Sequence, residues 1–262
     1  MYTTNHFIWL GICATLITVA LVWLKRKNVP LEKLLTFCCI GCIFSELTKV
    51  FGTITFVPSA DGGMMYPYLP MSNLPLHLCS IQIINIYYCR FSKNKKVKEI
   101  LLAFMYPSCT IGAFLALMIP TIFSGGVTFQ EAFLRAHPYE YFLYHAMLVM
   151  LGIYILISGQ VELKPRHYLT SLGILFLLAF FSLYINSMFA SATYENGTLI
   201  SVDYVPNLFF TYAPPIDIKL TQMWHWYVYL LIILGLAVTL VTLFYIPVFR
   251  KAAKQKRAQL VK

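Results

Sequence analysis

Seven long apolar segments constrain the fold of this chain more strongly than any other feature. A helix needs about 20 predominantly apolar residues to cross the hydrocarbon core of a bilayer. Such segments occur at residues 6–24, 34–56, 74–91, 98–122, 138–160, 167–190 and 222–246. Of the 262 residues, 59% are hydrophobic and 11% are charged, whereas soluble domains are about 25% charged. The sequence therefore predicts an all-α, polytopic membrane protein in which residues 1–262 form a single seven-helix transmembrane domain.

The basic residues predict how these segments cross the membrane. All but three of the 20 Lys and Arg residues lie in or beside the connections after the first, third and fifth segments, or in the C-terminal tail. Connections rich in Lys and Arg stay in the cytoplasm. We therefore expect a multi-pass protein of the cell membrane with its N-terminus outside and its C-terminus in the cytoplasm. The aromatic connections 57–73 and 191–221 would then lie outside, either as lids or as passive loops resting on lipid head groups.

The net charge and the cysteines exclude other classes of protein. The net charge of +10 follows the cytoplasmic connections, so it indicates topology and does not predict a nucleic-acid partner. All seven cysteines fall within apolar runs, which favours buried side chains or a reactive thiol over a disulfide framework.

Polar side chains of five predicted helices lie at similar depths in the outer half of the membrane. At about 1.5 Å per residue, Cys79 would lie about 8 Å and His145 about 10 Å below the outer boundary. Intramembrane charges are costly and indicate function by default. The inner half of the bundle is almost wholly apolar. The candidate site residues of this layer are Glu46, Lys49, His77, Cys79, Gln82, His145, Asn186 and His225.

Each of these residues also has a purely structural interpretation. Glu46 and Lys49 are three residues apart and can pair with each other. His145 can be an interhelical hydrogen-bonding residue, and Asn186 can be a helix-packing polar group, as can Ser182. His225, between two tryptophans, is typical of an aromatic belt at the membrane surface.

The combination of a thiol and an imidazole at one depth predicts nucleophilic chemistry. A thiol needs a base or a cationic neighbour to become a nucleophile, and a histidine on another helix can supply it. Cys79 would be the nucleophile and His145 the base, while Lys49 would stabilise an oxyanion and Glu46 would orient a histidine. On a continuous helix His77 would point away from Cys79, whereas Gln82 would share its face.

Several motifs resemble a known family. The sequence has "ELTKVFG" in the second segment, "LPLHLCS" at the start of the third and "NSMFAS" at the end of the sixth. In these motifs and in its seven segments it resembles the bacterial YwaF family. That family belongs with a eukaryotic transmembrane acyltransferase that remodels ether phospholipids, and it is distantly similar to androgen-induced-gene-type hydrolases of fatty-acid esters. The resemblance implies that Cys79, in the Leu-Pro-Leu-His-Leu-Cys run, is the nucleophile. In the hydrolase branch the histidine's counterpart would be His145.

These observations predict an acyltransferase that moves a fatty acyl group from a phospholipid to a lipid acceptor at the outer leaflet. Candidate acceptors are a lysophospholipid, a glycolipid or a lipoprotein, and with water as acceptor the same site would be a lipid ester hydrolase. No cofactor is expected, because the bilayer supplies the acyl donor. A transporter with a Glu/Lys/His relay is an alternative, although the apolar inner half argues against it. A zinc site built from His77, Cys79, His145 and His225 is disfavoured, because zinc sites usually have two close ligands on one element, whereas His77 and Cys79 on a continuous helix would point apart.

Overall fold

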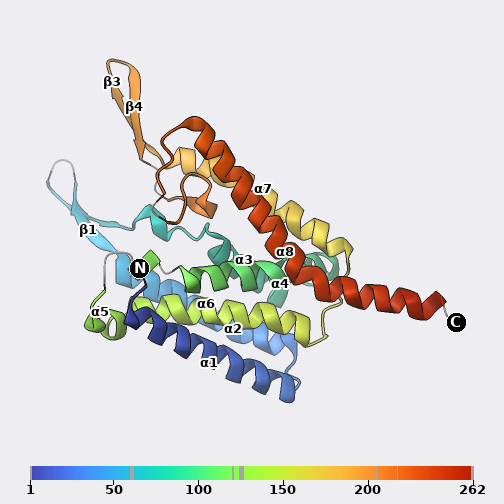
Figure 1. Cartoon of the computed structure of the whole chain (residues 1–262). Helices are drawn as coiled ribbons and strands as arrows, with labels where there is room; N and C mark the ends of the chain where they lie inside the picture. Colours follow the sequence, from blue (N-terminus) through green and yellow to red (C-terminus); the bar gives the residue numbers. More distant parts are fainter. Residues whose placement is uncertain are drawn as a thin grey trace.

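The computed structural model describes residues 2–59, 62–119, 121–123, 127–203, 206–216 and 218–260, which form a helical bundle with two exposed hairpins (Figure 1). The helices are α1 (Thr4–Arg26), α2 (Leu31–Thr53), α3 (Leu78–Phe91), α4 (Lys95–Met118), α5 (Phe129–Leu134), α6 (Ala136–Ile157), α7 (Arg166–Met188) and α8 (Met223–Leu260). Short 3₁₀ turns occur at η1 (Met71–Asn73), η2 (Thr121–Phe123) and η3 (Leu208–Phe210).

Six of the described helices are long and apolar enough to cross a membrane, namely α1, α2, α4, α6, α7 and α8. Most of their surface away from the bundle is apolar, as a lipid-facing surface should be. The chain is therefore a multi-pass membrane protein, as the apolar segments predicted. The third predicted segment, 74–91, differs: helix α3 has 14 residues, and at 1.5 Å per residue it spans only about 21 Å of the roughly 30 Å core.

Helix α3 begins late because the chain turns at Pro75. The Leu76 amide donates to the Leu74 carbonyl at 2.8 Å, which closes a tight turn around the proline. His77 then takes an extended backbone conformation at the N-cap position, and the helix starts at Leu78. The expectation that His77 and Cys79 lie on one continuous helix is therefore wrong, and the argument that their side chains must point apart does not apply.

Helices α4 and α6 form the centre of the bundle, and both are buried along most of their length. They approach closely at Gly152 of α6. A Cβ atom there would lie 2.2 Å from Oγ1 and 2.9 Å from the backbone N of Thr110. Small residues allow such close backbone contact between helices in membranes, where van der Waals packing drives association.

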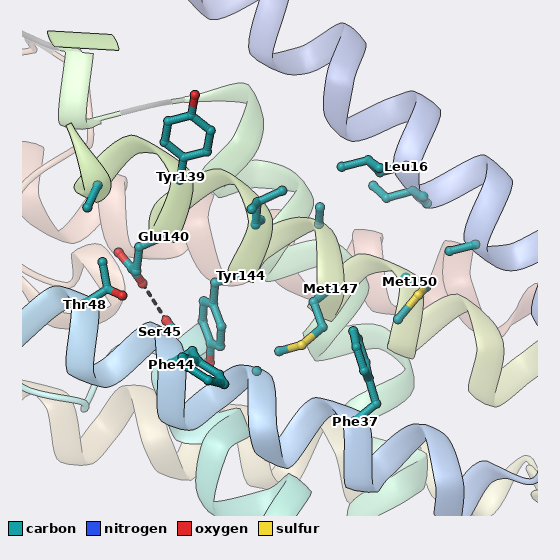
Figure 2. A pocket seen from close by; sticks show the side chains of 16 residues that line it. Leu16, Phe37, Phe44, Ser45, Thr48, Tyr139, Glu140, Tyr144, Met147 and Met150 are labelled. Carbon is teal, nitrogen blue, oxygen red and sulfur yellow. Dashed lines mark hydrogen bonds between the residues drawn. The ribbon is translucent and has the colours of Figure 1, made fainter. Parts of the chain in front are cut away.

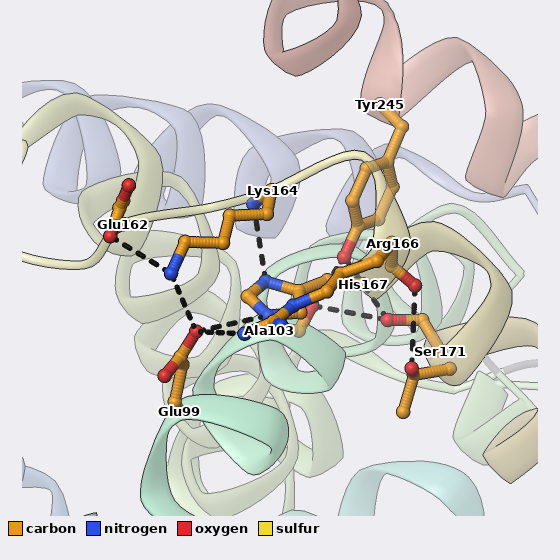
Figure 3. A network of polar contacts seen from close by, with 9 residues as sticks. Glu99, Ala103, Glu162, Lys164, Arg166, His167, Ser171 and Tyr245 are labelled. Atoms are coloured by element: carbon orange, nitrogen blue, oxygen red, sulfur yellow. Dashed lines mark hydrogen bonds and ion pairs between the residues drawn. The ribbon is translucent and has the colours of Figure 1, made fainter. Parts of the chain in front are cut away.

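A proline inside α4 frees a backbone carbonyl that neighbouring helices satisfy. Pro107 has no N–H, so the carbonyl of Ala103 loses its usual helical partner. The hydroxyls of Ser171 on α7 and Tyr245 on α8 donate to this carbonyl at 3.3 and 3.0 Å (Figure 3). These hydrogen bonds hold α7 and α8 against α4. They also satisfy the freed carbonyl, which has no water to bond to in the hydrocarbon core.

A cluster of charged side chains joins α4 to the start of α7 (Figure 3). One carboxylate oxygen of Glu99 lies 3.2 Å from both Arg166 and His167, and 3.4 Å from Lys164. Lys164 lies in the connection between α6 and α7, and its hydrogen bonds to Glu162 and Glu99 raise the pKa of its ammonium group. The cluster therefore fixes the connection that the sequence placed in the cytoplasm.

The two aromatic connections form antiparallel hairpins, β1 (Thr55–Pro58) with β2 (Met65–Tyr68), and β3 (Ser191–Glu195) with β4 (Thr198–Asp203). Both project from the same end of the bundle (Figure 1). The second turns at Asn196 and Gly197, which both have positive φ, as a tight two-residue hairpin turn requires. Their lid and passive-loop interpretations both stay open.

The Ala103 carbonyl provides a test of this packing. Replacing Tyr245 with Phe removes one of its donors and should lower the free energy of unfolding by about 0.6–2 kcal/mol. In a Pro107→Ala background, residue 107 supplies an N–H to the same carbonyl, so Tyr245→Phe should cost less. Unfolding in detergent of the wild type, both single variants and the double variant measures the difference. An equal cost of Tyr245→Phe in both backgrounds would contradict the assignment.

Candidate thiol site at the start of helix α3

Cys79 lies in the first turn of α3 and is half-buried. The first turn of a helix has N–H groups without helical partners, and the His77 side chain at the N-cap does not bond to any of them. These N–H groups and the positive end of the helix dipole favour a negative charge nearby. The start of α3 beside Cys79 is therefore a place where an oxyanion would be stabilised.

The Cys79 sulfur packs against α4 at a glycine. A Cβ atom added to Gly112 would lie 3.7 Å from Sγ of Cys79 and 3.2 Å from Cδ2 of Leu78. The missing side chain thus allows Leu78 and Cys79 to pack closely against α4.

A buried polar network lies one turn below Cys79. The Gln82 amide donates to the Ser108 hydroxyl at 3.2 Å and to the Leu78 carbonyl at 3.1 Å, and it accepts from Asn85 at 3.1 Å. Gln82 shares the α4-facing side of α3 with Cys79, as predicted. Sequence reasoning missed Asn85 and Ser108, although the spacing of three residues between Gln82 and Asn85 was a usable signal.

Helix α6 reaches the site through Tyr144. Its hydroxyl donates to the Cys79 carbonyl at 2.8 Å, and its side chain is buried. Cys42 of α2 and Cys109 of α4 lie within electrostatic range of the same hydroxyl. Side chains of α2, α4 and α6 therefore surround the first turn of α3, and sequence reasoning had not singled out Tyr144.

His145 is buried one residue further along α6. Its Nδ1 lies 2.6 Å from the Tyr141 carbonyl, and because a carbonyl only accepts, Nδ1 carries the hydrogen. In the neutral ring Nε2 then holds the lone pair, which is the form a general base requires. No hydrogen bond joins this ring to the Cys79 thiol in the described ranges, so their pairing stays a prediction.

Glu46 and Lys49 pair with each other on α2. Their carboxylate and ammonium groups are 2.6 Å apart, and only 13% of the Lys49 side chain is exposed. The two residues thus form the ion pair that their spacing predicted. Lys49 also lies within electrostatic range of His77, which places its charge near the start of α3.

Asn186 and His225 have contacts of their own, and in the described part of the chain neither forms a hydrogen bond with the Cys79 turn. The Asn186 amide donates to the Leu208 carbonyl at 3.2 Å and to the Thr211 hydroxyl at 3.0 Å, and it accepts from the Leu208 amide at 2.9 Å. Ser182 bonds to the same threonine. Asn186 therefore holds the η3 turn against α7, in agreement with its structural interpretation.

His225 lies in the first turn of α8. Its Nδ1 is 3.4 Å from the Thr221 hydroxyl and its ring is 4.0 Å from that of Trp224. These contacts fit the aromatic-belt interpretation, and in the described part of the chain no hydrogen bond connects His225 to the residues around Cys79.

The exposure of the seven cysteines predicts which thiol reacts first. Cys79 is half-buried, whereas the other six are buried, so a small membrane-permeant maleimide should add to one site rapidly. Intact-protein mass spectrometry over time would show a fast first adduct that disappears in Cys79→Ala and persists in Cys109→Ala. A fast adduct retained in Cys79→Ala would contradict the accessibility of this sulfur.

Comparison with known proteins places this site in a family. No curated protein and no solved structure matches the chain. The sequence model of the TMEM164 family matches residues 1–245, a range that contains every residue of the site and all six long apolar helices except the end of α8. The chain therefore belongs to the TMEM164 family.

Proposed function

We propose that this protein is a membrane-embedded acyltransferase in which Cys79 takes a fatty acyl group from a phospholipid and passes it to a lipid acceptor at the outer leaflet. The observation that carries the proposal is the position of Cys79 at the uncapped N-terminus of a helix inside the bundle. Membership of the TMEM164 family supports it, because the ether-phospholipid acyltransferase that the sequence resembles is a protein of this type.

The proposed topology has seven spans, with α3 as a short third crossing. Its C-terminal end carries Arg90, whose Nε donates to Thr36 at 2.6 Å near the cytoplasmic start of α2. A 14-residue helix that starts at this surface ends about 9 Å below the outer boundary. Non-helical backbone at this depth is tolerated where protein surrounds it, and half-helix N-termini at such depths bind polar substrate groups.

The first chemical step is attack of the Cys79 sulfur on the ester carbonyl of a phospholipid. Nε2 of His145 takes the thiol proton, the C–O ester bond breaks, and the proton passes to the departing lysolipid alcohol. The N–H groups of the α3 first turn hold the oxyanion, with Lys49 as a nearby positive charge. The step requires the imidazole to reach the thiol when substrate binds, and such contacts often tighten only in the complex.

The second step transfers the acyl group from the thioester. His145 accepts a proton from the acceptor hydroxyl or amine, whose oxygen or nitrogen attacks the thioester. The C–S bond breaks, and the proton passes from His145 to the Cys79 sulfur. A lysophospholipid, a glycolipid or the amino terminus of a lipoprotein would serve as acceptor. Water in the same position would make the protein a lipid ester hydrolase. No coenzyme takes part in either step.

The transporter alternative receives less support from the contacts of the same residues. Glu46 is paired with Lys49, His145 is bonded within its own helix, and His225 faces Thr221. A proton relay needs a continuous path of polar groups, and no hydrogen-bonded chain links these residues in the described ranges.

The nucleophile is tested by lipid mass spectrometry of membranes that contain the wild type or a Cys79 variant. Cys79→Ala should abolish the lipid change that the wild type produces, whereas Cys89→Ala, which alters a buried thiol on the same helix, should not. Intact mass after incubation with phospholipid should show an acyl adduct on the wild type. Full lipid turnover by Cys79→Ala would rule out the mechanism.

The base is tested separately. His145→Gln removes the lone pair that takes the thiol proton, so the rate of acyl transfer should fall by about 10²–10⁴. His225→Gln alters a histidine outside the cluster and should leave the rate within about twofold of the wild type. Both rates are followed by transfer of a labelled acyl chain in proteoliposomes. Equal losses in the two variants would contradict the role of His145.

A further inference from the structure

An open groove of about 710 Å³ runs between α1, α2 and α6, and Tyr144 is one of the residues that line it (Figure 2). Its walls are apolar along most of its length, with Phe37, Met147 and Met150 at one end and residues such as Leu16 along α1. Its dimensions and lining suit an acyl chain.

The opposite end of the groove is polar. Ser45 and Thr48 of α2 lie there with Glu140 of α6, and the Ser45 hydroxyl donates to Oε1 of Glu140 at 2.6 Å (Figure 2). The Glu140 side chain is 8% exposed, and Nδ1 of His137 lies 3.6 Å from its Oε2. No Lys or Arg pairs with Glu140 in the described part of the chain. A carboxylate this buried gains strongly from a cationic partner with good geometry.

We infer that this groove binds one acyl chain of a lipid whose head group carries a protonated amine, with Glu140 receiving the amine. The charges are complementary, because an ammonium group presents three donors to a carboxylate that has accepted one hydroxyl. The orientation of the groove also matches that of a lipid in the bilayer. Glu140 lies near the start of α6, and the apolar end of the groove lies about 15 Å further along that helix. A lipid bound in this way keeps its head and its chain at the depths they have in the bilayer.

The groove adjoins the thiol site through one side chain. Tyr144 lines the groove, and its hydroxyl donates to the Cys79 carbonyl. The assignment of the bound lipid as an acyl donor or acceptor rests on the proposed function, but its binding does not. Sequence reasoning did not single out Glu140, because its partner Ser45 lies on another helix.

The experiment uses the full chain carrying Cys79→Ala, so that no turnover occurs, in detergent with equal amounts of phosphatidylethanolamine and phosphatidylglycerol. Native mass spectrometry counts each lipid retained. We expect about a tenfold preference for the amine lipid, and its loss in Glu140→Gln, which keeps the shape of the side chain. Glu162→Gln is the matched control, since that carboxylate is exposed and paired with Lys164 at the opposite end of the bundle.

A second variant tests the groove independently of Glu140→Gln. Ala20→Phe on α1 places a ring in the groove without touching the carboxylate, and it should lower retention of the amine lipid several-fold. Equal retention of the two lipids by the Cys79→Ala protein would overturn the inference, as would unchanged preference in Glu140→Gln. If Cys79→Ala retains full acyl transfer but the Glu140-dependent preference persists, the proposed function fails and the lipid site stands.

Discussion

The requirement that backbone polar groups be satisfied in hydrocarbon governs this structure. Pro107, inside α4, and Pro75, just before α3, both interrupt helical hydrogen bonding, and the consequences of the two breaks differ. At Pro107 the freed Ala103 carbonyl receives hydroxyls from two neighbouring helices. At Pro75 the chain turns, and the first turn of α3 begins with no side-chain cap. At Pro107 the hydrogen bonds to the freed carbonyl link three helices. After Pro75, the first turn of α3 has N–H groups without helical partners beside the Cys79 thiol.

Hydrogen bonds from two helices hold the surroundings of that thiol in place. Gln82, Asn85 and Ser108 fix α3 against α4 by buried hydrogen bonds, and Tyr144 fixes the Cys79 backbone against α6. A site held in this way keeps its donors in place when charge develops on a substrate oxygen, which is the main source of electrostatic catalysis. The apolar groove proposed to bind a lipid is lined by Tyr144 and runs along the same helix.

Much of the fold could be predicted from the sequence, because six of the seven apolar segments are long enough to act as spans whatever their neighbours are. The third segment could not be judged by hydropathy alone, because the chain turns at Pro75 and α3 begins only at Leu78. The depths of Cys79 and His145 stay predictions, and that of Cys79 was counted along a helix from Leu74, whereas α3 begins at Leu78. Rotation about the helix axis depends on packing, and it is the reason why Tyr144 contacts Cys79 while His145 bonds to Tyr141. The contact of Ser45 with Glu140 joins residues on separate helices and needed the tertiary structure.

The most direct test of the central claim is an experimental structure of the Cys79→Ala protein in lipid nanodiscs. The account predicts a bound lipid whose ester carbonyl oxygen lies within hydrogen-bonding distance of the backbone N–H groups at Leu78, residue 79 or Ser80. A first turn of α3 sealed from lipid by packed side chains, with lipid esters bound only elsewhere on the bundle, would contradict it.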